Sequence, residues 1–132
     1  MDVNITSDHV PVVIHDDLVR GPHQGEALVG ELSLKELRSF PAMEKVPTLE
    51  EVLGLFGRKV RFLIELKPQR RYDWDSRLVH ETVGLLKKWD MCDRVIVDSF
   101  SPDIVLSTKR YSGCQVGEDV PPHVTPTKAL LF

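Results

Sequence analysis

Four polar residues lie at or near the ends of short apolar segments, where a folded chain can bring them together. His15 directly follows the run VPVVI, and Glu65 and Lys67 end a second run, VRFLIELK. Asp2 belongs to MDVNIT, in which alternation places Asp2 and Asn4 on one face. If these strands point the same way, their carboxyl ends meet at one mouth. Asp2, His15, Glu65 and Lys67 then form a catalytic arrangement.

Each of these side chain types suits a step of polar catalysis. Two carboxylates about 4 Å apart repel each other by roughly 4 kcal/mol at an effective dielectric of 20, so a converging pair favours a bound cation. Histidine titrates near neutral pH and can act as a general acid or base. The alternative is structural: residues 15–17 would be an ordinary polar turn, and Glu65 and Lys67 an exposed pair on a strand edge. Three further acids are interpreted as residues that hold turns or orient neighbours: Asp16, Asp17 and Asp98.

The strands that would position these residues are short apolar runs separated by helical patterns. Such runs, rich in valine and isoleucine, are too short for helices and favour strands. Strands are predicted at residues 1–6, 10–15, 60–66, 94–97 and, weakly, 114–116. The strand at residues 10–15 is of the kind that is buried on both faces in a parallel sheet. As an alternative, the first two strands could pair as a hairpin.

Capping residues and the 3.6-residue spacing of apolar side chains predict the helices. Four helices are predicted, beginning after Ser33, after Thr48, at Asp75 or Ser76, and at Pro102. In the first two, a glutamate three residues after the capping residue completes a capping box. The glycine-rich residues 17–30 are expected to form a loop. No regular structure is expected from residue 118 onward.

The alternation of strands and helices predicts an α/β architecture with a largely parallel sheet. A complete (β/α)8 barrel needs about 250 residues, so the 132 residues of this chain can supply about half of one. We therefore expect a single partial domain over residues 1–132. The strands at residues 10–15 and 94–97 would leave open sheet edges, through which the chain is expected to self-associate.

Composition excludes several classes of partner. The net charge of −3 rules out a strongly basic surface, so no nucleic acid partner is expected. No run of about 18 apolar residues is present, so no transmembrane segment is expected. An acid and a strand follow Met1 directly, so no signal peptide is expected, and the compartment stays open. Cys92 and Cys114 match no metal-ligand spacing and are expected to be free thiols.

The motifs and their order resemble the glycerophosphodiester phosphodiesterase family. MDVNITSDHVPVVIHDD is similar to the stretch in which E-x-D, a T-x-D-G-like turn and a V-x-H-D strand follow one another in that family. SLKEL, VPTLEEVL, IELKP and VIVDSFSPDIV continue the resemblance to about residue 117. It implies a (β/α)8 barrel and hydrolysis of glycerophosphodiesters, in glycerophospholipid metabolism, with a bound divalent cation, Ca²⁺ or Mg²⁺.

The resemblance also implies a role for each of the four residues. Asp2 and Glu65 match metal ligands, His15 a catalytic histidine, and Lys67 a basic residue that faces the substrate phosphate. The glutamate of E-x-D would fall immediately before Met1, and the H-R-G strand with the other catalytic histidine has no counterpart. The chain is therefore expected to be an internal fragment, a sequence with a misplaced start or a shortened product, and to be inactive alone. The alternative is a non-catalytic barrel remnant that serves as a binding or structural module.

Overall fold

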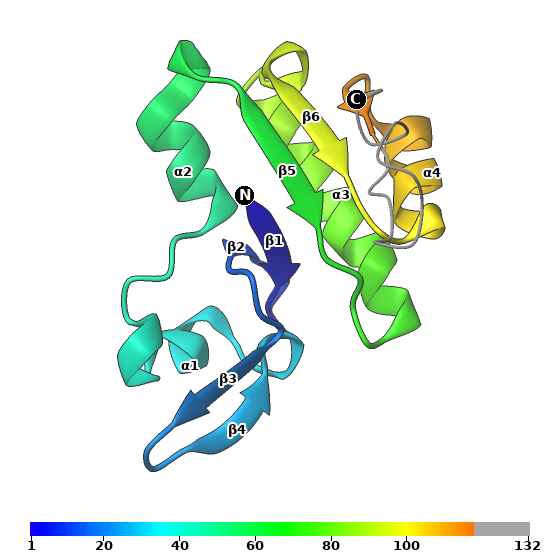
Figure 1. Cartoon of the computed structure of the whole chain (residues 1–132). Coiled ribbons are helices and arrows are strands. Elements are labelled where there is room, and N and C mark those ends of the chain that lie inside the picture. The colour runs from blue at the N-terminus through cyan, green and yellow to red at the C-terminus, as the bar shows by residue number, and fades with distance from the viewer. Residues whose placement is uncertain (118–132) are drawn as a thin grey trace, which may run out of the picture.

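The structure is a computed structural model that describes residues 1–117, without the side chain of Tyr72. The prediction for residues 118 onward lies outside this part of the chain. The centre of the molecule is a five-stranded sheet in the order β2-β1-β5-β6-β7. The strands are β1 (Asp2–Ile5), β2 (Pro11–Val13), β5 (Phe62–Leu66), β6 (Val95–Asp98) and β7 (Gln115–Val116). All except β2 run parallel to one another, which confirms the predicted largely parallel sheet (Figure 1).

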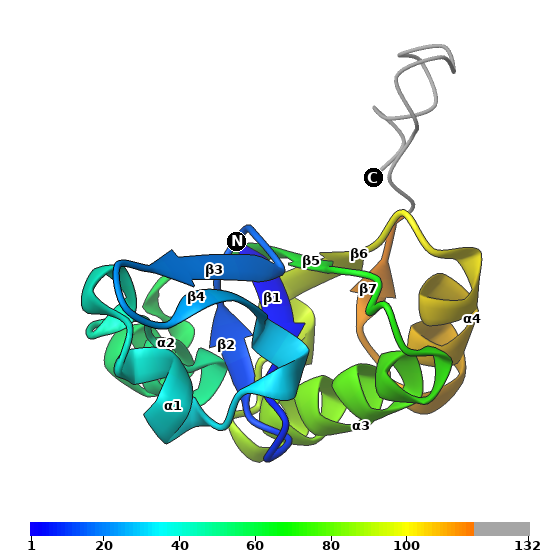
Figure 2. The same ribbon diagram turned by 90° about the horizontal axis from the view of Figure 1, so that it is seen from below.

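Helices connect the parallel strands and cover one face of the sheet. They are α2 (Leu49–Phe56), which with the short turn η3 (Gly57–Lys59) precedes β5, α3 (Tyr72–Lys88), which with η4 (Cys92–Arg94) joins β5 to β6, and α4 (Pro102–Tyr111), which joins β6 to β7. Figure 2 shows α3 lying beneath β5 and β6. Strand–helix–strand units in chain order are the building blocks of a (β/α)8 barrel, and this sheet is part of such a barrel. None of the helices within residues 1–117 is both long enough and apolar enough to cross a membrane.

The main hydrophobic core fills the space between the sheet and these helices. Val3 and Ile64 face this core from the strands and are fully buried. They belong to the same cluster as Leu78 of α3 and Ile104 of α4. The residues between them along each strand point to the opposite face, where Leu63 is 52% exposed. Alternation along the strands thus separates an apolar face from a more polar one.

The strand β2 runs in the opposite direction to the one predicted. The predicted parallel direction of residues 10–15 is wrong, because β2 is antiparallel to β1. The predicted burial on both faces holds for Pro11 and Val12, which point to opposite faces and are both buried. A tight turn reverses the chain: the amide of Thr6 donates to the carbonyl of Val10 at 3.1 Å, and His9 takes a left-handed φ of 64°. Three intervening residues suffice for a hairpin, whereas a parallel connection needs about a dozen. The hairpin alternative is therefore confirmed.

The strand at residues 94–97 does not leave an open edge, contrary to expectation. The observed β6 pairs with β5 on one side and with β7 on the other. The weakly predicted strand at 114–116 forms as β7 and supplies this second partner. Within the described residues, the edges of the sheet are therefore β2 and β7.

Residues 17–30 form regular structure in place of the expected loop. β3 (Leu18–Gly21) and β4 (Gly25–Leu28) pair as an antiparallel hairpin, and the turn η1 (Val29–Glu31) follows. Gly25 has a φ of 73°, a conformation that other residues rarely adopt, so the glycine serves the hairpin turn. An isolated two-stranded hairpin is marginally stable at best, so this one depends on packing that the local sequence does not reveal.

That packing comes from a second hydrophobic cluster. The hairpin, α1 (Leu34–Arg38) and η2 (Pro41–Met43) form what we call the lobe, residues 17–46. Its buried cluster consists of Val19, Val29, Leu37, Phe40 and Val46 together with Val12 of β2. In Figure 1 the arrowheads of β1, β5 and β6 point toward the end of the molecule at which the β3–β4 hairpin lies.

Three of the four predicted helix starts are confirmed, those of α1, α2 and α4, and one is shifted. Ser33 and Glu36 exchange both bonds of a capping box at the start of α1. Thr48 caps α2, but the Glu51 carboxylate binds Arg38 at 2.8 Å and leaves the capping box open. The helix expected from Asp75 or Ser76 begins at Tyr72, because Asp75 accepts a bond from the Gln69 amide instead of capping its own helix.

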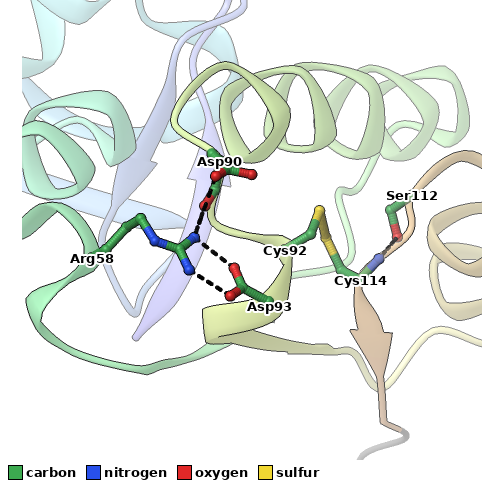
Figure 3. Close-up of a disulfide and its surroundings, with 6 residues drawn as sticks. All are labelled: Arg58, Asp90, Cys92, Asp93, Ser112 and Cys114. Carbon is green, nitrogen blue, oxygen red and sulfur yellow. Dashed lines mark hydrogen bonds and ion pairs between the residues drawn. A yellow bond between two sulfur atoms is a disulfide. The ribbon is translucent and has the colours of Figure 1, made fainter.

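Cys92 and Cys114 form a disulfide, so the expectation of two free thiols is wrong. They are 22 positions apart in the sequence, and their Cα atoms are 4.4 Å apart. Each lies just before a strand, and the parallel pairing of β6 with β7 brings the two strand starts together. Spacing rules cannot reveal this proximity. Figure 3 shows the bond beside Arg58, which donates two hydrogen bonds to the Asp93 carboxylate.

Replacing both cysteines with serine should lower the free energy of unfolding by about 3 kcal/mol, because the bond closes a loop and restricts the unfolded chain. The measurement is urea denaturation of the oxidised chain and of the Cys92→Ser/Cys114→Ser variant. Reductant should bring the unsubstituted chain to the stability of the variant and leave the variant unchanged. Equal stability with and without reductant would contradict the bond.

Candidate active site

Three acidic residues lie side by side across the centre of the sheet. Asp2 of β1 is in register with Glu65 of β5, and Glu65 is in register with Asp98 of β6. Their strand neighbours Val3 and Leu66 are buried in the helix-covered core. Because side chains alternate along a strand, the acids belong to the opposite face. Glu65 and Asp98 are also near the carboxyl ends of their strands, where barrel enzymes place their active sites.

Lys67 places its ammonium group close to the first two acids. It forms an ion pair with the Oε2 atom of Glu65, and its Nζ lies 4.0 Å from the Oδ1 atom of Asp2. The backbone amide of Lys67 donates to the carbonyl of Val3 at 3.0 Å and extends the β1–β5 ladder beyond the end of β5. All three side chains are between 15% and 28% exposed. The cluster is thus partly shielded from water and still accessible.

His15 reaches the same place from the end of β2. The amide of Ile14 donates to the carbonyl of Asp2 at 3.0 Å and holds this segment beside the start of β1. The Nε2 atom of His15 lies 3.9 Å from the Oδ2 atom of Asp2, and its Nδ1 lies 2.8 Å from the Oδ1 atom of Asp16. The His15 side chain is 75% exposed, so the imidazole is open to solvent.

The structure brings together all four residues that the sequence singled out, namely Asp2, His15, Glu65 and Lys67. The sequence argument assumed that their strands all point the same way. This holds for β1 and β5 but not for β2. His15 arrives because the hairpin returns the chain to the beginning of β1.

The surroundings of Asp2 disfavour its charged form. Burial raises the pKa of Asp2, the hydrogen bond and charge of Glu65 act in the same direction, and the positive charge of Lys67 opposes them. Two converging carboxylates whose negative charge is only partly balanced by Lys67 fit a hard divalent cation, which prefers oxygen ligands. Asp2 and Glu65 are the residues that would hold it. No larger cluster of potential metal-ligating side chains, with three or more His, Cys, Asp or Glu, occurs in residues 1–117.

Two residues beside the site received no catalytic or metal-binding role from the sequence. Gln69 donates from Nε2 to the Oδ1 atom of Asn4 at 3.1 Å. Strand alternation places Asn4 on the same face as Asp2, but its partner is 65 positions away and has no local signal. Asp98, interpreted as a turn or orienting residue, is the last residue of β6 and is 3% exposed. Its place next to Glu65 follows only from strand pairing.

The loop after β5 connects the site to the lobe. The Nε atom of Arg70 donates to the Oδ2 atom of Asp17 at 2.9 Å, and this bond raises the pKa of the Arg70 guanidinium. Trp74 contacts the ring of His9 at a centroid distance of 5.0 Å and the guanidinium of Arg71 at 5.7 Å. The lobe, the β1–β2 hairpin and the start of α3 are thus all fastened around the loop that follows Lys67.

Comparison with known proteins agrees with the motifs. The sequence pattern of the glycerophosphoryl diester phosphodiesterase family matches residues 1–121. The Bacillus subtilis protein YhdW, provisionally named a glycerophosphodiester phosphodiesterase, is 41% identical over 111 residues, which are 76% of this chain and 44% of YhdW. A glycerophosphodiester phosphodiesterase of Caldanaerobacter subterraneus is 30% identical over 110 residues, which cover 76% of this chain and 45% of that protein. The chain thus spans less than half the length of these relatives.

Solved structures show the same fold. A glycerophosphodiester phosphodiesterase from Parabacteroides distasonis matches with a TM-score of 0.77 at 24% identity, over 98% of this chain and 54% of that one. A phosphodiesterase from Oleispira antarctica, solved in complex with its product sn-glycerol-3-phosphate, matches with a TM-score of 0.75 at 24% identity, over 98% of this chain and 57% of that one. The predicted partial barrel, about half of a full one, is confirmed. The chain belongs to the glycerophosphoryl diester phosphodiesterase family.

Proposed function

We propose that this chain carries part of the active site of a metal-dependent phosphodiesterase, which hydrolyses glycerophosphodiesters to an alcohol and glycerol phosphate. The observation that carries the proposal is the convergence of two carboxylates, an ammonium group and an imidazole at one end of the sheet. Family membership supports the substrate class. The Oleispira phosphodiesterase with bound glycerol phosphate points to the same chemistry. The metabolic setting would be the turnover of glycerophospholipids.

Asp2, Glu65 and Lys67, the partly shielded side chains, would bind the phosphate group, the two acids through a cation. Asp2 and Glu65 would hold Ca²⁺ or Mg²⁺ between their carboxylates. Such a cation, when bound, neutralises phosphate oxygens as a Lewis acid. Lys67 would place its ammonium against the same phosphate as a compact point charge. Its ion pair with Glu65 keeps the ammonium near the site before substrate arrives.

His15 would transfer the proton that hydrolysis requires. When the bond between phosphorus and the leaving oxygen breaks, the alcohol must take up a proton, which is the task of a general acid. The Nδ1 atom of His15 faces Asp16, so a proton held there leaves Nε2 to exchange a proton with the substrate. The exposure of the ring makes this exchange sterically feasible.

We infer that the 132 residues alone hydrolyse glycerophosphodiesters negligibly. The family's other catalytic histidine and the acidic partner of Asp2 have no counterpart in the sequence of this chain.

A non-catalytic remnant is the second candidate, and one observation favours it. Residues 1–117 contain no cluster of three or more potential metal-ligating His, Cys, Asp or Glu side chains. A binding or structural module would keep the barrel packing and need no cation.

Metal binding separates the two candidates. We expect calorimetric titration with Ca²⁺ or Mg²⁺ to show weak binding, with a dissociation constant on the order of 10⁻³ M, because two carboxylates supply few of the ligands these ions take. Glu65→Gln should abolish the signal. Glu44→Gln, which alters an exposed acid outside the site, should leave it unchanged. Equal heats from the original chain and Glu65→Gln would remove the proposed site and favour the remnant.

The role of His15 can be measured in a chimera whose barrel is completed with the remaining segments of YhdW. His15→Ala should lower turnover of a glycerophosphodiester by about 10²-fold or more, as loss of a general acid or base usually does. The control is His80→Ala, on the exposed face of α3. Unchanged turnover in a folded His15→Ala chimera would reduce His15 to a residue at the end of a strand.

We expect the isolated chain to self-associate. Within residues 1–117, β7 is paired on one side only, and the outer side of β2 is covered only by an isolated bridge to Thr48. Leu63, in the central strand β5, is 52% exposed on the face away from the helices. An unpaired strand edge and an exposed apolar side chain each favour association. Light scattering should give a mass above that of one chain, and Leu63→Gln should lower it more than Leu106→Gln on α4. A monomer that melts cooperatively would count against this prediction.

A further inference from the structure

A fully buried amide lies directly beside the proposed site. Asn4 is 0% exposed in the β1–β2 hairpin, opposite Val12. Its Nδ2 atom donates to the carbonyl of Ile14 at 2.9 Å, and its Oδ1 atom accepts from Gln69 at 3.1 Å. Both polar atoms of the side chain are therefore used, which avoids the cost of burying an unsatisfied amide.

Gln69 completes the link on the other side. Its Nε2 atom also donates to the carbonyl of Lys67 at 2.7 Å, and its backbone amide donates to the Oδ1 atom of Asp75 at 2.6 Å. Its Oε1 atom lies 3.8 Å from the position that a Cβ would occupy on Gly30, so the side chain is packed against the lobe. One side chain thus contacts the loop after β5 and the lobe, while its backbone bonds to the start of α3.

The two ends of this series of hydrogen bonds belong to the segments that carry His15 and Lys67. Backbone bonds from the Ile14 amide to Asp2 and from the Lys67 amide to Val3 already attach both segments to β1. The sheet can therefore form without the side-chain link. The side-chain link adds a second attachment to each segment, at the carbonyls of Ile14 and Lys67. This attachment restricts rotation of the peptide group next to each of the two functional side chains.

We propose that Asn4 and Gln69 are positioning residues that set the separation between the His15 imidazole and the Lys67 ammonium. This inference deepens the proposed function and rests on it. A proton donor and a phosphate-binding cation act on one diester only when both are held in a productive geometry. An apolar pair of similar size would fill the same space without fixing either carbonyl.

The test uses the full chain and two variants of similar volume. Gln69→Met leaves the bond between Asn4 and the segment before His15 intact, and Asn4→Leu leaves the bond between Gln69 and Lys67 intact. NMR signals of the His15 ring and the Lys67 ammonium report the two ends. We expect each variant to move both sets of signals, because the two ends are linked. Gln24→Met, which replaces an exposed amide in the lobe, should move neither.

Calorimetric titration with sn-glycerol 3-phosphate in the presence of Mg²⁺ gives a second readout. Gln69→Met should bind about tenfold more weakly, and its melting temperature should fall by several degrees, because the buried Oδ1 atom of Asn4 loses its donor. If Asn4→Leu does not fold, Gln69→Met alone decides. Unmoved His15 signals and unchanged affinity in folded Gln69→Met would overturn the inference and leave the proposed function standing. Moved His15 signals in Gln69→Met, with no ligand binding by the original chain, would support the link and count against the function.

Discussion

The register between β1 and β5 is the constraint on which the rest of the structure depends. Two backbone bonds fix it, from the Glu65 amide to the Met1 carbonyl at 2.8 Å and from the Lys67 amide to the Val3 carbonyl at 3.0 Å. A slip of one residue would turn the apolar side chains of β1 outward and Asp2 into the core. Each fully buried aliphatic side chain contributes about 2 kcal/mol, so the four in these strands outweigh the repulsion of two acids. Burial of the apolar side chains on one face of each strand therefore fixes the position of the polar side chains on the other face.

The two ends of the sheet have different tasks. Around the amino ends of β6 and β7, the chain is fastened by the Cys92–Cys114 disulfide and by the ion pair of Arg58 with Asp93. The polar cluster lies at the other end, near the carboxyl ends of β5 and β6, and the lobe packs around a separate hydrophobic cluster. In barrel enzymes, stabilising contacts gather at one end of the barrel and the active site lies at the other. The residues of both ends can be found in the sequence, but only the direction of the strands shows at which end of the sheet each residue lies.

How much the sequence predicts depends on the distance between the partners. Strand ends and helix caps are local, so the sequence predicts that Glu65 lies near the end of a strand and that Ser33 and Glu36 form a capping box, and the structure shows both. Features that need a distant partner were missed. The β3–β4 hairpin depends on α1 for its cover, and Cys92 meets Cys114 only because β7 forms beside β6. Gln69 is 65 positions from Asn4, and no periodicity connects them.

The electrostatics of the site work against the stability of the fold. A carboxyl whose pKa is raised by folding binds its proton more tightly in the folded chain than in the unfolded chain. The contribution of Asp2 to stability is therefore greatest in acid and declines as the pH rises through its folded pKa. Ionising Asp2 beside Glu65 has a cost that the positive charge of Lys67 only partly offsets. A fold keeps such a cluster when the packing elsewhere is sufficient, and conflicts of this kind gather at functional sites.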